Sequence, residues 1–298
     1  MRTQPECLEC FLDDIRSAID LLVTEEGERL EILRHCLRIL SEEFGYEKVP
    51  SFYITKLHRL LKGKAGIPLP FAKARRRTNE IGIAIAERIK GDANGLSGLE
   101  RFRFLASWAL AANSLDSRTA GTGYQFKPEG AWTYLASYLA KGIAIDQIDR
   151  LYEVVKAGPK VLYIHDNVGE IALDMALVEE LKALGCSVTS TIRGGPITSD
   201  ATVEDAKFVG LDKTSNKIIL AGPDTLGISW EEASSELRAE LQRAELIIAK
   251  GQANYYVLSE HREEIPGLVF CLFTTKCDPV SRNFNLTGKQ MVATFLQL

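Results

Sequence analysis

The sequence lacks a hydrophobic run long enough to cross a lipid bilayer. Its longest apolar stretch, from Phe104 to Ala112, is far shorter than the roughly 20 residues that a transmembrane helix needs. The first residues include Arg2 and Glu6 and show no apolar segment of a signal peptide. We therefore expect a cytoplasmic protein that does not bind a membrane.

The chain also lacks an excess of charge of either sign. Over 298 residues it carries 36 Lys and Arg against 40 Asp and Glu, which gives a formal net charge of −4. Without a strongly positive field there is no general attraction for nucleic acid or for anionic lipid, and we expect neither as a partner. The hydrophobic fraction of 46% and the length are typical of a globular protein with a large core.

Cysteines and nucleotide-binding loops are scarce. Six cysteines in a chain of this length do not form a disulfide scaffold. Cys7 and Cys10 form a CxxC, but no second CxxC and no HxxxH follows to complete a zinc site. Two buried thiols on one helix face and a metal or redox site both remain open, and in either case we predict that the pair is not catalytic. No G-x-G-x-x-G and no P-loop motif occurs, so dinucleotide and P-loop chemistry are not indicated.

The pattern of apolar residues changes near residue 150. From Cys7 to about Asp149 apolar residues recur every three to four positions, which predicts a mainly helical portion over 1–150. In 151–298 short β-branched runs alternate with helical segments, which predicts an α/β domain with a doubly wound, mostly parallel sheet. The predicted strands are 160–165, 186–192, 217–220, 246–249, 268–275 and 291–296. A basic run, Lys73 and Arg75 to Arg77, is typical of a solvated helix face.

Polar residues follow four of these strands. The groups are Asp166-Asn167, Arg193-Gly194-Gly195 leading to Ser199-Asp200, Lys250-Gly251 leading to Asn254, and Lys276-Cys277. Each group alone can be a helix N-cap or a turn. Together they indicate a site, because ligands bind beyond the carboxyl ends of the strands in an open α/β sheet.

The residue types in these groups indicate phosphate chemistry. Carboxylate and amide oxygens suit Mg²⁺ or Mn²⁺, and a lysine suits an anion. A divalent cation and a lysine facing one crevice are what phosphoryl transfer needs. Gly194, Gly195 and Gly251 would allow backbone N–H groups to approach a phosphate closely.

In this order, the motifs resemble those of the damage-control phosphatase family, and their spacing is similar to its archaeal branch that carries a CxxC. The matching pieces are Cys7 with Cys10, Ala112-Asn113 with Leu115-Asp116, Asp166 to Glu170 with Asp174, Arg193 to Pro196, Ser199 to Thr202 with Glu204-Asp205, Lys250 to Tyr255, and Lys276-Cys277 with Val280 and Arg282. The matches extend over nearly the whole chain.

The resemblance implies a helical N-terminal portion packed on a three-layer α/β/α sandwich. It implies metal-dependent hydrolysis of phosphate monoesters of small metabolites, such as sugar phosphates or damaged phosphometabolites. The implied metal is Mn²⁺, Mg²⁺, Co²⁺ or Ni²⁺, held by Asp166, Asn167 and Asp200. Lys250 and Asn254 would act on the phosphate as catalytic residues.

The resemblance also implies which residues line the crevice. The substrate-binding residues would be Asn113, Asp116, Arg193, Gly194 and Gly251. The chain departs from the family at Ser199, where Asn is expected, and at Gln252, where Asp is common. Neither change removes an implied metal ligand, so the departures bear on substrate preference.

Several alternatives stay open at the level of the sequence. Glu170 can support the metal site or be a first-turn carboxylate that the helix dipole favours. Asp205 is typical of a helix start, and strand alternation turns His165 away from Asp166, which favours a structural role. His35, His58 and His261 have no partner that the sequence suggests.

Two other functions compete with the phosphatase. One is an S-adenosylmethionine-dependent carboxyl methyltransferase, and the other is a non-catalytic protein that binds phosphometabolites. The residues leave open the physiological substrate, the choice of metal and the oligomeric state. They also leave open whether hydrolysis uses a covalent carboxylate intermediate or a metal-bound water.

Overall fold

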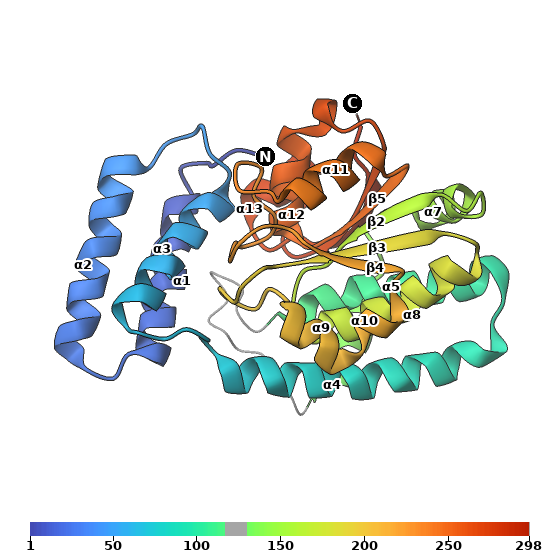
Figure 1. The fold of residues 1–298 in the computed structure, drawn as a ribbon, viewed down its shortest axis with the longest axis horizontal. Helices are drawn as coiled ribbons and strands as arrows, with labels where there is room; N and C mark the ends of the chain where they lie inside the picture. Colours follow the sequence, from blue (N-terminus) through green and yellow to red (C-terminus); the bar gives the residue numbers. More distant parts are fainter. Residues whose placement is uncertain (117–129, 298) are drawn as a thin grey trace.

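The computed structural model describes residues 1–116 and 130–297. It confirms the predicted fold class, because a mostly parallel sheet carries helices on both faces and further helices lie to one side (Figure 1). Within these two ranges no helix is both long and apolar enough to cross a membrane.

The sheet in the described part of the chain has seven strands in the order β1-β7-β6-β5-β2-β3-β4. The strands are β1 (Ile145–Asp146), β2 (Lys160–Ile164), β3 (Ser187–Ile192), β4 (Lys217–Leu220), β5 (Leu246–Lys250), β6 (Leu268–Thr274) and β7 (Met291–Phe295). Neighbours pair in parallel, except that β6 and β7 are antiparallel. The six predicted strands occur within one residue of their expected bounds. β1 was not predicted, because two residues carry no recognisable period.

The central strands are apolar on both sides because helices cover both faces of the sheet. In β5, Leu246 and Ile248 belong to the hydrophobic core on one face, whereas Ile247 and Ala249 belong to the core on the other. This alternation along β5 decides where its last residue, Lys250, points.

The first face of the sheet is covered by helices that mostly precede the sheet in sequence. They are α4 (Ala72–Asp92), α5 (Gly98–Ala112), α6 (Ala131–Lys141), α7 (Ile148–Val155) and α8 (Glu170–Ala183), with short 3-10 turns η1 (Ala93–Gly95) and η2 (Asn113–Leu115). Leu105 of α5 and Leu151 of α7 share one core with Val161 of β2. The chain was predicted to divide into 1–150 and 151–298, and this core joins residues on both sides of that position.

The second face carries the helices that follow β4. They are α11 (Ser235–Arg243), α12 (Gln252–Glu260) and α13 (Asp278–Asn283), with the 3-10 turn η4 (Arg262–Glu264). Two short helices, α9 (Val203–Val209) and α10 (Leu211–Thr214), pack beside β3 in a small cluster of their own. α11 follows a Ser234 N-cap, whose hydroxyl accepts a hydrogen bond from the Leu237 N–H at 3.0 Å.

The first three helices form a separate bundle beside the sheet (Figure 1). They are α1 (Cys7–Leu22), α2 (Glu26–Glu43) and α3 (Pro50–Lys64). Their buried faces meet in a hydrophobic core that includes Phe11, Ile15, Ile32 and Leu57. We call residues 7–64 the helical bundle.

Ion pairs fasten the helical bundle to the loop between β4 and α11. Asp224 of this loop pairs with Arg59 of α3 at 3.0 Å and also with Lys62. Burial raises the pKa of Asp224, but the hydrogen bonds and charges of Lys62 and Arg59 outweigh it and bring the pKa below its usual range. The carboxylate is therefore ionised at neutral pH, when these pairs hold the bundle against the rest of the molecule.

Candidate functional site

The order of strands places a crevice at the carboxyl end of β2. From β2 the chain adds β3 and β4 on one side and then returns to add β5 and β6 on the other. Ligands of open α/β sheets bind at such a switch point, beyond the carboxyl ends of the strands. Asp166 and Asn167 follow β2, and Gly251 follows its parallel neighbour β5. The predicted residues of these two strand ends therefore meet.

Gly251 makes room for the carboxylate of Asp166. Its φ of 80° is in the left-handed region, and a Cβ added there would lie 1.9 Å from Oδ2 of Asp166. Its N–H donates to the carbonyl of Leu272 at 3.1 Å. We had expected Gly251 to approach the phosphate through this N–H. In the structure this N–H is hydrogen-bonded to β6, so it is not directed at a phosphate. The glycine instead leaves space for the carboxylate of Asp166.

Asp166 is a buried carboxylate held by two amides. Its Oδ2 accepts hydrogen bonds from Nδ2 of Asn167 at 2.7 Å and of Asn113 at 3.2 Å. Burial raises the pKa of Asp166 well above its usual range, and the nearby negative charges of Glu170 and Asp200 raise it further. A bound cation would relieve this accumulation of negative charge.

Glu170 and Asn113 fix the amides around Asp166. Glu170 lies in the first turn of α8, is fully buried, and accepts hydrogen bonds from Nδ2 of Asn113 at 3.1 Å and of Asn167 at 3.3 Å. The side-chain oxygen of Asn113 accepts from the N–H of Thr274 at 3.0 Å, at the end of β6. These contacts favour the first alternative for Glu170, in which it supports the site. Asn113 links Asp166 to the end of the neighbouring strand β6.

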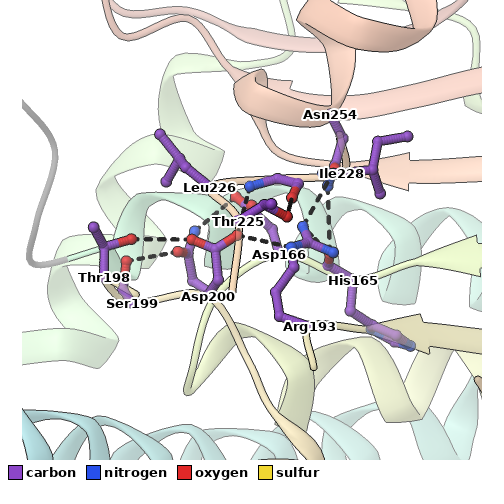
Figure 2. A network of polar contacts seen from close by, with 12 residues as sticks. His165, Asp166, Arg193, Thr198, Ser199, Asp200, Thr225, Leu226, Ile228 and Asn254 are labelled. Atoms are coloured by element: carbon purple, nitrogen blue, oxygen red, sulfur yellow. Dashed lines mark hydrogen bonds and ion pairs between the residues drawn. The ribbon is translucent and has the colours of Figure 1, made fainter. Parts of the chain in front are cut away.

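Asp200 reaches the same place on a loop that runs beside the end of β2. Asn167 and Asp200 form an antiparallel bridge, and the N–H of Ala201 donates to the carbonyl of Asp166 at 2.8 Å. Figure 2 shows the Asp200 carboxylate between Thr198 and Arg193. It accepts from Thr198 Oγ1 at 3.0 Å, Arg193 Nε at 3.0 Å and the Gly227 N–H at 2.7 Å. Asp200 is thus held from three directions and carries no exposed surface.

Arg193 and Asn254 brace Asp200 from behind the crevice. Arg193 Nη2 donates to Oδ1 of Asn254 and to the carbonyl of His165, both at 3.2 Å (Figure 2). Asn254 in turn donates to the carbonyl of Lys250 at 2.7 Å. Both side chains are fully buried and neither lines the cavity described below. These hydrogen bonds join both side chains to other groups of the protein, whereas we had expected Arg193 to bind substrate and Asn254 to be catalytic.

Arg75 is a supporting residue that the sequence analysis missed. It was grouped with a basic run typical of a solvated face, but its side chain is buried. Its guanidinium donates to the carbonyls of Thr198 at 2.7 Å and Asp200 at 2.8 Å, and it pairs with Asp205. Arg75 therefore holds the loop that carries Asp200. A charge run on a helix contains no signal that one member turns inward.

Lys250 does not face the crevice, contrary to expectation. It shares the face of Leu246 and Ile248, and its ammonium lies 2.7 Å from Asp174 and 2.8 Å from Glu170. Burial lowers its pKa, but the two carboxylates more than offset this, and the pKa is raised. Side chains on a strand alternate between faces, and that rule sends Lys250 toward α8.

A cavity of about 90 Å³ opens in front of Asp166 and Asn167. Lys276, which follows β6, lines this cavity together with Asp116. Its ammonium lies 2.6 Å from Oδ2 of Asp116, and its side chain is 15% exposed. Burial lowers the pKa of Lys276, but Asp116 and Asp166 raise it by more, so the group is a cation at neutral pH. The strand pattern placed Lys276 at a strand end but indicated no role for it.

Gly194 lies away from this cavity. Its N–H donates to the carbonyl of Gly222 at 3.0 Å, and a Cβ added at this position would lie 2.3 Å from that oxygen. The glycine is needed for the close packing of two loops. The structure therefore does not place Gly194 among the substrate-binding residues, as we had expected.

Cys10 and Cys277 lie in the cavity wall, and Cys7 is buried beside them. Burial raises the pKa of Cys10 to about 12 and also raises the pKa of Cys277. A thiol that stays protonated is a poor nucleophile. This accords with a non-catalytic CxxC, which stays a prediction.

Two assignments from the sequence match the contacts observed. Asp205 accepts from the N–H of Thr202 at 3.0 Å, as a capping residue at the start of α9. His165 is buried, with its ring nitrogens 2.9 Å from Asp174 and 2.9 Å from Ser190. Neither side chain lines the cavity.

The chemistry of the donor set fits a hard divalent cation. Asp166 and Asp200 supply carboxylates and Asn167 an amide oxygen, and such ions take oxygen ligands and keep several waters. In residues 1–116 and 130–297 no three His, Cys, Asp or Glu side chains are placed to share a metal ion.

Comparisons with known proteins agree with one another. The damage-control phosphatase ARMT1-like domain matches residues 3–291. A damage-control phosphatase of Archaeoglobus fulgidus is 29% identical over 297 residues, 100% of both chains, and one of Pyrococcus horikoshii is 28% identical over 293 residues, 98% of this chain and 97% of that protein. An uncharacterized protein of Methanocaldococcus jannaschii is 30% identical over 288 residues, 96% of this chain and 93% of that protein. The crystal structure of a DUF89 family protein from Pyrococcus horikoshii has a TM-score of 0.86 at 28% identity, with 100% of both chains covered.

Proposed function

This chain belongs to the damage-control phosphatase ARMT1-like family, and we propose that it is a metal-dependent phosphatase that releases phosphate from monoesters of small metabolites. The observation that carries the proposal is the meeting of Asp166, Asn167 and Lys276 around one cavity at the switch point of the sheet. Oxygen ligands for a cation and a separate fixed ammonium are the two parts that phosphoryl transfer requires.

Asp166, Asn167 and Asp200 would hold the cation, which we expect to be Mn²⁺, Mg²⁺, Co²⁺ or Ni²⁺. When bound, such an ion polarises phosphoryl oxygens and stabilises the charge that develops on them. Neighbouring side chains would keep these three ligands in place. Asn113 orients Asp166, Glu170 orients the amide of Asn167, and Arg193 and Thr198 orient Asp200.

Lys276 would bind the phosphoryl group in the role that we had expected for Lys250. Its ammonium is held by Asp116 on the cavity wall, so it presents a positive charge in a fixed place before substrate arrives. A point charge suits the spread negative charge of a loose phosphoryl transition state. In the hydrolysis the oxygen of a water bonds to phosphorus, the ester P–O bond breaks, and the alcohol leaves with a proton.

Neither competing function gains support from the comparisons. Two of the relatives bear phosphatase names, and none bears a methyltransferase name. Asp166 and Asn167 stand directly after β2, where a nucleoside-binding sheet would carry a Gly-rich loop. A non-catalytic binder of phosphometabolites is an outcome that the experiment can return.

The test is a phosphate-release assay on chelator-treated protein. Mn²⁺, Mg²⁺, Co²⁺ and Ni²⁺ are added back singly, with p-nitrophenyl phosphate and a panel of sugar phosphates as substrates. We expect at least one metal to restore turnover, and Asp166→Asn to remove it while the protein stays folded. Calorimetric binding of a sugar phosphate without phosphate release under any metal would contradict the proposal and identify a binding protein.

A further inference from the structure

A short piece of backbone between β4 and α11 connects the helical bundle to Asp200. We call residues 224–228 the linking segment. Three successive N–H groups of this segment donate hydrogen bonds to side chains in different parts of the molecule. The donors and acceptors are Leu226 to Oγ1 of Thr55 in α3 at 3.0 Å, Gly227 to Oδ1 of Asp200 at 2.7 Å, and Ile228 to Oδ1 of Asn254 at 2.8 Å (Figure 2). The bundle and the proposed metal ligand are therefore held by adjacent peptide groups.

The linking segment is closely packed where it meets Asp200. Gly227 has a φ of 65°, and a Cβ added there would lie 2.8 Å from Cβ of Ala253 and 3.2 Å from the backbone nitrogen of Asn254. The hydroxyl of Thr225, a buried residue, donates to the carbonyl of Gly227 at 2.7 Å. With so little free space, a shift of one peptide in the segment is passed on to the next.

The bundle holds the other part of the linking segment by polar and apolar contacts. Asp224 pairs with Lys62, whose ammonium also donates to the carbonyl of Pro196 at 2.8 Å, in the loop that leads to Asp200. The side chain of Leu226 packs against the core of the bundle and against the core on the second face of the sheet. The position of the segment thus depends on the position of α3.

Thr55 does not line the cavity in front of Asp166. Its side chain is buried and lines a second cavity, of about 270 Å³, on the other side of the linking segment. Leu226 lines both cavities. Thr55 is therefore placed to act on the site through its hydrogen bond to the segment and not by touching substrate.

We propose that Thr55 is a positioning residue for Asp200, and that the helical bundle thereby sets the metal affinity of the site. Its hydroxyl fixes the peptide of Leu226, and the next peptide, that of Gly227, fixes Oδ1 of Asp200. Groups that hydrogen-bond to metal ligands orient them, and their loss typically lowers metal affinity about 10–100-fold. The inference rests on the proposed phosphatase function, in which Asp200 holds the cation.

Calorimetric titration of chelator-treated protein with Mn²⁺ tests the inference. Thr55→Val removes the hydroxyl, keeps a branched side chain, and leaves the N–H of Leu226 without its acceptor. We expect the Kd for Mn²⁺ to rise about tenfold or more, and Thr55→Ser, which retains a hydroxyl, to stay within about threefold of wild type. The Mn²⁺ concentration for half-maximal phosphate release should rise by the same factor as the Kd, while kcat at saturating Mn²⁺ stays within about threefold of wild type.

Tyr53→Phe is the matched control, two residues earlier on α3. The Tyr53 hydroxyl is hydrogen-bonded within the bundle, since it accepts from the N–H of Gly45 at 2.8 Å and donates to the carbonyl of Glu43 at 3.0 Å. Its loss should lower the free energy of unfolding and leave the Kd for Mn²⁺ at the wild-type value. An equal rise in Kd for Tyr53→Phe and Thr55→Val would reduce the effect to general destabilisation and overturn the inference.

Lys62→Met tests the same connection if Thr55→Val does not fold. It removes the contacts of the bundle with Asp224 and with the carbonyl of Pro196, and it should raise the Kd for Mn²⁺ by about threefold or more. A folded Lys62→Met protein with the wild-type Kd would count against the connection.

The two proposals fail in different ways. If the wild-type protein binds Mn²⁺ and a folded Thr55→Val protein binds it equally well, the role of Thr55 is refuted and the phosphatase stands. If the wild-type protein binds neither Mn²⁺ nor any of the other three metals, the proposed metal site is refuted and the inference about Thr55 falls with it.

Discussion

Lys276→Ala is the sharpest test of the site. The ammonium is 2.6 Å from Asp116, and the side chain is 15% exposed, so solvent screens it only partly. Near a protein surface, a unit charge about 4 Å from another interacts by about 4 kcal/mol. Removal of one preorganised electrostatic contact in known active sites lowers kcat about 10² to 10³-fold, or about 2.7–4 kcal/mol. We expect a loss of that size in Lys276→Ala.

The assay is steady-state kinetics on the best substrate with saturating metal. Lys276→Arg should recover only part of kcat, because the guanidinium is larger and forked. Lys289→Ala removes an exposed lysine between α13 and β7, and this control should match the wild-type protein. A folded Lys276→Ala enzyme with kcat within about threefold of wild type would refute the assignment of Lys276 to the phosphoryl group.

Three further predictions concern stability and metal binding. Lys250→Met leaves the buried Glu170 and Asp174 without their cation, so denaturant titration should show a loss of about 3–5 kcal/mol in the free energy of unfolding. Asp166→Asn should abolish metal binding by calorimetry yet leave the Tm of the metal-free protein equal or higher. Burial, and after it repulsion from Glu170 and Asp200, raise the pKa of Asp166, and a neutral amide avoids both costs; a clear fall in Tm would contradict this reasoning. Asp224→Asn should lower the free energy of unfolding by about 1 kcal/mol at neutral pH, where the ion pairs of Asp224 are intact. Because the folded pKa of Asp224 lies below the unfolded value near 3.8, this difference should disappear as pH falls through the folded pKa, and a difference that persists in acid would argue against the ion pairs.

The architecture and the proposed metal ligands follow from local patterns in the sequence. Each predicted strand is a short apolar run, and polar residues at the strand ends mark the edge where ligands bind. Asp166, Asn167 and Asp200 were found by this rule, and the structure brings them together through the bridge between Asn167 and Asp200. Strand alternation predicted that His165 points away from Asp166, and the side chain is buried. The same alternation, applied to Leu246 and Ile248, also assigns Lys250 to the interior, so that error was avoidable.

Other parts of the site depend on contacts between distant segments. Lys276 is fixed by Asp116, 160 residues away, and Asp14, which also lines the cavity, by His58, 44 residues away. Arg75 reaches the loop of Asp200 across 125 residues. No period or motif in one segment encodes such a partner, because the pairing is set by how whole helices pack. Asn254 shows the reverse case, since its place at a strand end was predictable but its inward orientation was not.

The separate core of the helical bundle has a consequence for how such an enzyme can change over evolutionary time. Substitutions at the bundle residues that line the cavity change the shape of its wall, whereas the core that packs against the sheet is made of other residues. Their cost to stability falls on the bundle and its ion pairs with Asp224, rather than on the strands that carry Asp166 and Asn167. The cavity wall can therefore change through substitutions in the bundle helices, while Asp166 and Asn167 at the strand end stay the same.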